Sequence, residues 1–267
     1  MADSGSSLPL SKLSLTDRSS FMGVPVHHYD LEETCAIAHE AMKTGRRVQQ
    51  VDINVYKMTA LRSDPDLLGA VHASDLVSVD GMGVLLGCKL LNVPVRGRVA
   101  GVDLMQSIFA LCEREGFRPY LFGAKQAVLE EAVEKLHRDY PALEIAGIRN
   151  GYFKPEDERE IVEDIRNSGA DCLFVGISSP VKENFLFKYR DELGAPYTMG
   201  VGGAFDVLAG KVSRAPEWMQ RAGLEWLHRL LLEPRRLWQR YLTSNSQYAL
   251  LLLKALMSKY ITRPNAS

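Results

Sequence analysis

The sequence predicts an open α/β fold in which helices cover both faces of a mostly parallel sheet, followed by a helical appendage. Two observations support this. Strand-like and helix-like segments alternate over the first 210 residues, which is typical of a parallel sheet built from βαβ units. After Gly210 the strand-like segments stop, and helical spacing rich in arginine and tryptophan begins. A chain of 267 residues is long enough for one large core and an appendage.

Short runs of β-branched, aromatic and other apolar residues predict strands at residues 24–28, 48–54, 76–79, 119–124, 143–148, 172–177 and 197–202. Between them, apolar residues at helical spacing predict helices at residues 30–44, from 64, from 83, 101–115, 126–139, 155–168 and 180–192. Several helices carry end signals: Asp30 is a capping residue, Gly45 and Gly116 are helix stops, and Pro65 suits a first helical position.

Composition divides the chain into three parts. Residues 1–20 are serine-rich and lack an apolar signal core, so we expect a flexible N-terminal arm. Residues 21–210 form the predicted Rossmann-like α/β domain and carry a net charge of −8. Residues 211–267 carry ten Lys or Arg against three Glu, a net charge of +7. The total charge of −1 argues against a nucleic-acid partner, while the basic appendage favours an anionic one.

The appendage is predicted to be amphipathic. Leu237, Trp238, Tyr241 and Leu242 share one helical face, flanked by arginines. Such a helix is typical of one that lies in the headgroup layer of a membrane. A subunit interface in a homo-oligomer would use the same apolar stripe and is the alternative. The longest late apolar run, residues 248–253, is too short to span a bilayer.

Asp80 is the main candidate for chemistry. It follows the strand at residues 76–79, at the end where open α/β sheets bind ligands, and Gly81 and Gly83 follow it. One interpretation is a general base, with the glycines leaving room for a substrate. The other is an N-cap for the next helix. Both predict the same fold.

Two familiar site motifs are disfavoured. The glycines in "GMGVLLG" are one residue too widely spaced for the dinucleotide fingerprint, and the motif is not in the first βαβ unit. The literal D-x-D pair, Asp64 and Asp66, is better explained as a helix cap with a favourable first-turn charge. We therefore expect no dinucleotide or other cofactor and no metal clamp.

Three other strand ends are candidate substrate contacts. Gly123 and Ala124 form a strand-to-helix turn. Gly202 and Gly203 expose backbone N–H groups suited to an anion such as a phosphate. Tyr152, next to Phe153 in a loop, would either stack on a base or sugar or pack as a lid over the core.

Seven stretches together resemble the WecG/TagA/CpsF family of bacterial glycosyltransferases, glycosyltransferase family 26. They occur in the family's order and cover roughly residues 22–240. The last two are specific in combination. The stretches are "INVYKM" (53–58), "DGMGV" (80–84), "RVAGVDLM" (98–105), "LFGA" (121–124), "GYFKPE" (151–156), "GVGGAFDVLAGKVSRAP" (200–216) and "GLEWLHRLLLEPRR" (223–236).

The resemblance implies a Rossmann-like core whose C-terminal appendage docks on the membrane and helps to close the active site. It implies an inverting, metal-independent transferase. The donor would be a UDP-sugar, carrying N-acetylmannosamine, its uronic acid or glucose. The acceptor would be a sugar on a polyprenyl diphosphate, in cell-surface polysaccharide biosynthesis at the cytoplasmic membrane face.

The resemblance also implies roles for single residues. Asp80 matches the catalytic base and Arg98 an active-site arginine. Asn54 matches an asparagine after the second strand. The appendage arginines expected near the diphosphate are Arg229, Arg235 and Arg236.

Two positions depart from the family pattern. Asp52 stands where a Thr or small residue is usual, and Lys182, before Glu183, replaces a Gln near the expected sugar site. We expect Asp52 and Lys182 to form an ion pair. Because both changes introduce charge at that site, a non-catalytic nucleotide-sugar-binding homologue stays open as an alternative. A dinucleotide-dependent oxidoreductase is a third.

Overall fold

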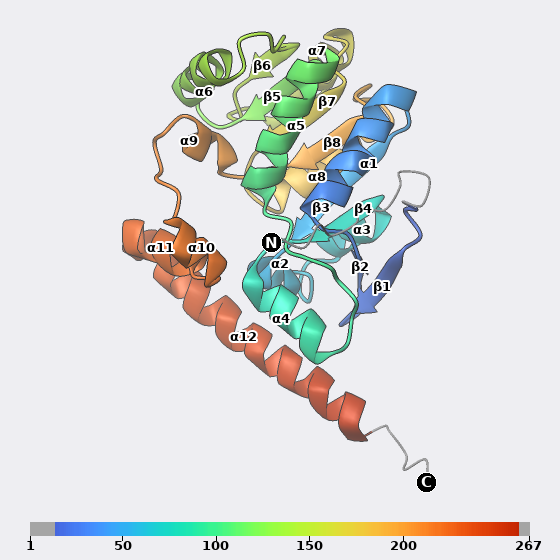
Figure 1. Ribbon diagram of the computed structural model, residues 1–267, viewed down its shortest axis with the longest axis vertical. Helices are drawn as coiled ribbons and strands as arrows, with labels where there is room; N and C mark the ends of the chain where they lie inside the picture. The colour runs from blue at the N-terminus through green and yellow to red at the C-terminus, as the bar shows by residue number, and fades with distance from the viewer. Residues whose placement is uncertain (1–13, 262–267) are drawn as a thin grey trace, which may run out of the picture.

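The computed structural model describes residues 14–261 and centres on a six-stranded, fully parallel sheet (Figure 1). The strands lie in the order β4-β3-β8-β7-β5-β6. Their bounds are β3 Val48–Ile53, β4 Leu76–Val79, β5 Pro119–Gly123, β6 Gly147–Arg149, β7 Cys172–Gly176 and β8 Tyr197–Gly200. The predicted Rossmann-like α/β fold is confirmed. Because all six strands run the same way, their carboxyl ends meet at one edge of the sheet.

Helices cover both faces of this sheet, as predicted (Figure 1). One face packs on α1 (Leu31–Thr44), α5 (Gly101–Glu115), α6 (Gln126–Asp139) and α9 (Ala204–Leu208). The other packs on α3 (Pro65–Ala73), α7 (Glu158–Asn167) and α8 (Val181–Lys188), with a short 3₁₀ turn, η2 (Pro155–Asp157), before α7. Apolar faces on both sides explain why the strands read as continuous apolar runs rather than alternating ones.

The helix-end signals act as predicted. The Asp30 side chain and the Glu33 side chain form a reciprocal capping box at the start of α1, and Gly45 ends that helix with a φ of 70°. The Leu67 N–H donates to Asp64 Oδ1 at 2.9 Å, so this carboxylate of the D-x-D pair caps α3.

An antiparallel ribbon, β1 (Arg18–Phe21) and β2 (Val24–His27), differs from the prediction. Residues 18–20 were assigned to the N-terminal arm and residues 24–28 to the main sheet. The reason is a turn at Met22 and Gly23, whose positive φ values reverse the chain. The Val77 N–H donates to His27 Nδ1, so the ribbon is fastened to the edge strand β4. Residues 1–13 of the predicted arm lie outside the described residues.

Two helices flank the ends of β3 and β4. They are α2 (Val55–Ala60), which was not predicted, and α4 (Met82–Leu90). The appendage lies against this part of the domain (Figure 1) and consists of α10 (Glu217–Arg221), α11 (Glu225–Leu232) and the long α12 (Pro234–Ile261). Helix α12 packs along α2, and the Tyr248 hydroxyl donates to the Gly83 carbonyl at 3.0 Å.

The predicted apolar stripe of the appendage is divided between two faces of α12. Leu237 is buried and Tyr241 packs edge-on against Trp226, whereas Trp238 and Leu242 are exposed. The outward apolar side chains of this helix are Trp238, Leu242, Leu250, Leu253 and Met257. In the described range, 14–261, no helix combines the length and the apolar character that crossing a membrane would need.

Candidate active site

Asp80 and Asn54 lie at the carboxyl ends of the neighbouring strands β4 and β3. The Asp80 N–H donates to the Ile53 carbonyl at 2.8 Å, which holds the two strand ends in register. About a third of the Asp80 side chain, 31%, is exposed. Its carboxylate is therefore fixed by backbone pairing while remaining accessible to a substrate.

Asp80 does not cap the helix that follows it. The N-cap of α4 is Gly81, and no side chain makes a capping hydrogen bond there. Asn54 does cap a helix, because its Oδ1 accepts the Lys57 N–H of α2 at 3.0 Å. The structural explanation that sequence reasoning left open for Asp80 thus fails, whereas Asn54 has a structural role whether or not it binds substrate.

The two glycines after Asp80 serve the backbone and the packing. Gly81 has a φ of 107°, which side chains disfavour. A Cβ on Gly83 would lie 2.8 Å from Val55 Cγ2, so a glycine is needed for α4 to approach α2. Gly83 thus has a packing role of its own, and the space that the two glycines leave for a substrate stays a prediction.

A cluster of charges surrounds Asp80. Arg98 Nε lies 3.9 Å from Asp80 Oδ1, and Arg98 Nη2 lies 2.5 Å from Glu225 Oε2 of α11. Arg214, on the segment before α10, lies 3.9 Å from the other oxygen of Glu225 through Nε and 2.5 Å from Asp103 Oδ1 through Nη1. Residues of the α/β fold and of the C-terminal helices thus share one charge cluster.

The pKa of Asp80 is raised to about 6. Removal of water from around the carboxylate is the largest cause, followed by the negative charge of Asp52. Arg98 and Arg229 act in the opposite direction, and Glu225 adds to the increase. A carboxylate with a pKa just below neutrality is mostly ionised at pH 7 yet basic enough to accept a proton during a reaction.

A buried network lies beside Asp80. Lys57 Nζ contacts Asp52 Oδ1 at 3.0 Å and Glu183 Oε1 at 2.8 Å, and Lys182 Nζ also donates to Glu183 Oε1. The prediction of a direct ion pair between Asp52 and Lys182 is wrong. In the described residues Asp52 pairs with Lys57, Lys182 pairs with Glu183, and Lys57 joins the two pairs by contacting Glu183. Two lysines facing two carboxylates make the network neutral.

Burial and pairing shift these groups in different directions. The pKa of Glu183 falls to about 2 because Lys57 and Lys182 outweigh the effect of burial. The Lys57 pKa is raised, since the attraction of Asp52 and Glu183 exceeds the effect of its burial. The Lys182 pKa is lowered, first by burial and then by the charge of Lys57. Lys57 is therefore the central cation of the network.

The glycine turns lie farther along the same edge of the sheet. Gly123, the last residue of β5, approaches Gly176 so closely that a Cβ on it would lie 2.4 Å from the Gly176 backbone. Ala124 adopts a φ of 53° there. Gly202 has a φ of 54°, and Gly203 precedes α9. These four positions stay predicted substrate contacts.

The loop after β6 separates its two aromatic residues. Phe153 packs against Phe122 with ring centroids 5.5 Å apart, so it belongs to the core. Tyr152 is 70% exposed, and the Gly151 N–H beside it donates to the Ala124 carbonyl at 2.9 Å. Tyr152 therefore does not close over the core, and it is available to a ligand at the Ala124 turn.

The predicted appendage arginines differ in position. Arg229, on α11, is near enough to influence the pKa of Asp80. Arg235 is exposed at the start of α12. The Arg236 side chain lies outside the described part of the structure. Sequence reasoning missed Lys57, Arg214 and Glu225, although all three fall within stretches that carry the family resemblance.

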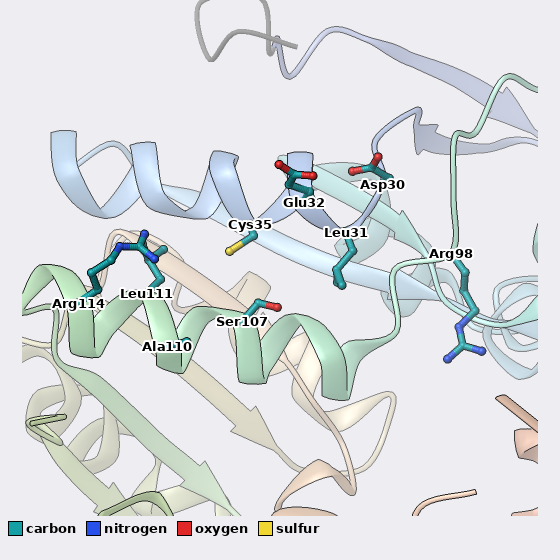
Figure 2. Close-up of a pocket in the computed structure, with 9 residues that line it drawn as sticks. All are labelled: Asp30, Leu31, Glu32, Cys35, Arg98, Ser107, Ala110, Leu111 and Arg114. Atoms are coloured by element: carbon teal, nitrogen blue, oxygen red, sulfur yellow. The ribbon is translucent and has the colours of Figure 1, made fainter. Parts of the chain in front are cut away.

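The structure also contains a groove of about 640 Å³ between α1 and α5 (Figure 2). Its lining residues include Leu31, Cys35, Ser107 and Leu111, with Arg98 at one end. In Figure 2 the Arg98 guanidinium extends away from α1. The groove thus touches the charge cluster only through Arg98, and the convergent polar groups lie at the strand ends instead. Over residues 14–261, no three His, Cys, Asp or Glu side chains are grouped so that they could hold a metal ion.

Comparison with known proteins gives consistent matches. The model of the glycosyl transferase WecG/TagA/CpsF family matches residues 19–262. A protein of Bacillus spizizenii (strain ATCC 23059 / NRRL B-14472 / W23) is 38% identical over 191 residues, which cover 72% of this chain and 73% of that protein. A protein of Bacillus subtilis (strain 168) is 36% identical over the same shares. Both are named N-acetylglucosaminyldiphosphoundecaprenol N-acetyl-beta-D-mannosaminyltransferase.

Proposed function

Because the chain belongs to the WecG/TagA/CpsF family of glycosyl transferases, we propose that it transfers a hexosyl group from a UDP-sugar to a polyprenyl-diphosphate-linked sugar. The transfer inverts the anomeric centre, needs no metal, and contributes to cell-surface polysaccharide biosynthesis. The observation that carries the proposal is Asp80. Its accessible carboxylate has no capping role, stands at the end of β4 and has a raised pKa beside Arg98.

In this reaction Asp80 takes the proton of an acceptor hydroxyl. The hydroxyl oxygen bonds to the anomeric carbon from the face opposite UDP, while the bond from that carbon to the diphosphate oxygen breaks and UDP leaves with the electron pair. A single displacement of this kind inverts the configuration. A positioned base typically contributes about 10²–10⁴ in rate.

The leaving diphosphate needs positive charge and hydrogen-bond donors. Arg98 and Arg229 are cations whose charges lower the pKa of Asp80, and Arg235 and Arg236 follow on α12. The turns at Gly123 and Gly202 add backbone N–H groups. Arginines are well suited to this task because their planar groups bind phosphates through two hydrogen bonds.

The donor sugar is proposed to be N-acetylmannosamine, on a lipid-linked N-acetylglucosamine acceptor. The names of the two Bacillus relatives support this choice. The buried network supports it as well. Lys182 is only 4% exposed and donates to Glu183, so it offers no free positive charge to an acidic sugar.

The direct test measures UDP release from UDP-N-acetylmannosamine, its uronic acid and UDP-glucose, with a soluble diphosphate-linked N-acetylglucosamine acceptor. We expect acceptor-dependent release from UDP-N-acetylmannosamine at an undiminished rate in excess EDTA. NMR of the product should show the inverted anomer. Release from none of the three donors would exclude the proposed activity, and loss of activity in EDTA would exclude its metal independence.

The pH dependence follows from the pKa of Asp80. The base acts when ionised, so kcat/KM should fall about tenfold per pH unit below a pKa of about 6 and reach a plateau above it. Measuring kcat/KM for UDP release from pH 4.5 to 8.5 checks this. An acidic limb near pH 4, the ordinary range of a carboxyl group, would contradict the assignment of Asp80.

We also propose that the appendage binds the inner surface of the cytoplasmic membrane through the outward face of α12. Its exposed Trp238, Leu242, Leu250, Leu253 and Met257 would enter the acyl boundary. Arginines and lysines of the appendage would meet anionic headgroups, each gaining roughly 1 kcal/mol. A contact between two copies of the chain through the same face is the alternative.

A double substitution, Trp238→Glu with Leu242→Glu, should abolish co-flotation with anionic phospholipid vesicles, because it places charges on the inserting face. Gln239→Glu, at an exposed neighbouring position, adds a charge without removing an apolar side chain and should retain most binding. Unchanged flotation of the double variant, combined with a smaller mass by sedimentation, would identify a subunit interface instead.

A further inference from the structure

The appendage makes three contacts near the end of β4, two with α4 and one with the segment before α5. Gly223 packs against Met82 so closely that a Cβ on it would lie 2.4 Å from Met82 Cγ. The Tyr248 hydroxyl donates to the Gly83 carbonyl. The third contact joins Glu225 to Arg98 and is the charged one of the three. All three reach residues close to Asp80 in the chain or in space.

Glu225 is the link between two arginines. Its Oε2 lies 2.5 Å from Arg98 Nη2, and its Oε1 lies 3.9 Å from Arg214 Nε. Arg98 continues to Asp80, and Arg214 continues to Asp103 in the first turn of α5. An unbroken series of charges therefore runs from the catalytic strand through α11 to α5.

Because it is partly buried, the ion pair between Arg98 and Glu225 is expected to be stronger than an exposed surface pair. The Arg98 side chain is 13% exposed and the Glu225 side chain 28%. Exposed pairs contribute little because water and salt screen them, whereas a largely desolvated arginine is held strongly by its partner. Glu225 is also the first residue of α11, four residues before Arg229, so its position helps to set where Arg229 lies.

We propose that Glu225 is a positioning residue that latches α11 over the catalytic strand end and holds the Arg98 guanidinium back from full pairing with Asp80. This inference rests on the proposed function. Arg98 has two acidic neighbours and is closer to Glu225, at 2.5 Å, than to Asp80, at 3.9 Å. Without Glu225, Arg98 would turn to Asp80, and a carboxylate paired closely with a guanidinium is a weaker base.

The pH profile reports this arrangement directly. The charged groups facing Asp80 are Asp52 from β3, Arg98 from the segment before α5, Arg214 from the segment before α10, and Arg229 and Glu225 from α11. Removing the Glu225 charge takes away one acidic neighbour and strengthens the effect of Arg98. Both changes lower the pKa of Asp80.

The test compares Glu225→Gln with Glu217→Gln. Glu217 lies on α10 in a fully exposed pair with Arg221 and serves as the matched control. We expect Glu225→Gln to lower kcat roughly tenfold, to change KM for the UDP-sugar less than threefold, and to move the acidic limb of kcat/KM to lower pH. Glu225→Asp, which keeps the charge, should return the limb toward wild type.

A second readout does not depend on activity. Hydrogen exchange in residues 225–232 should accelerate in Glu225→Gln, while residues around Tyr248 stay protected by the remaining contacts. If Glu225→Gln changed neither hydrogen exchange in residues 225–232 nor the acidic limb of kcat/KM, the proposed role of Glu225 would be contradicted. A wild-type enzyme that releases no UDP would instead refute the proposed function, and the exchange measurement would still test the latch.

Discussion

Replacing Asp80 by Asn should reduce UDP release about 10²–10⁴-fold while leaving the fold intact, because an amide cannot accept the hydroxyl proton. The substitution preserves size, and Asp80 forms its fold-supporting hydrogen bond through its backbone N–H to Ile53. Steady-state kinetics with the lipid-linked acceptor measure the effect. The loss should appear in kcat, with KM for the donor little changed.

Asp64→Asn is the matched control. Asp64, like Asp80, shortly precedes a helix, but its carboxylate caps α3, and asparagine caps almost as well. This variant should keep near-normal transfer. If Asp80→Asn also kept near-normal transfer, Asp80 would not be the base.

Asp80→Asn should also raise the thermal stability of the protein at pH 7.5. The fold raises the Asp80 pKa from 3.8 to about 6, so the folded chain binds the proton more tightly than the unfolded chain. Ionised Asp80 therefore lowers the free energy of unfolding. This decrease is absent below pH 3.8, grows between pH 3.8 and 6, and is complete above pH 6. The Tm advantage of Asp80→Asn should therefore vanish near pH 4, which calorimetry at the two pH values can check.

Replacing Lys57 by Met should lower the free energy of unfolding by about 3 kcal/mol at pH 7.5, as expected when one partner of a buried ion pair is removed. The methionine fills similar space but leaves Asp52 unpaired and leaves Glu183 with Lys182 alone. Urea unfolding followed by circular dichroism measures the change. The pKa of Glu183 is about 2 in the fold, against an ordinary value of 4.5, so the loss should shrink only as the pH falls from about 4.5 toward 2.

Lys89→Met provides the comparison, since Lys89 is exposed on α4 and the substitution is chemically the same. It should alter the free energy of unfolding by less than about 0.5 kcal/mol. A loss below about 1 kcal/mol in Lys57→Met would show that water, rather than Lys57, stabilises the two carboxylates.

Much of the fold could be predicted because its signals are local. The alternation of strands and helices indicated the parallel sheet, and Asp30, Gly45 and Asp64 marked helix ends through contacts within a few residues. Parallel strands also end at one edge, so Asp80 could be placed at the ligand-binding edge before its neighbours were known. The strand at residues 24–28 was predicted and is β2, but β1 and its antiparallel pairing with β2, outside the main sheet, were not.

The buried network beside Asp80 was harder to predict because its members come from segments that are far apart in the chain. Lys57 and Glu183 are 126 positions apart in the chain, yet they are in contact. Lys57 lies on the helix after β3 and Glu183 on the helix after β7, and these two strands are the neighbours of β8 in the sheet. Asp52 and Lys182 were expected to pair directly, but Lys57 satisfies Asp52 first. Sequence patterns report charge and spacing, and they do not report which partner is nearest.

The sequence by itself determined the α/β class, the family and the position of Asp80 at a strand end. Each of these depends on periodicity, composition or a local motif. The tertiary structure decided that Asp80 caps no helix, that the network beside it is neutral, and that Glu225 of the appendage reaches Arg98. Those properties depend on burial and on distances between segments far apart in the chain, which only the packed fold defines.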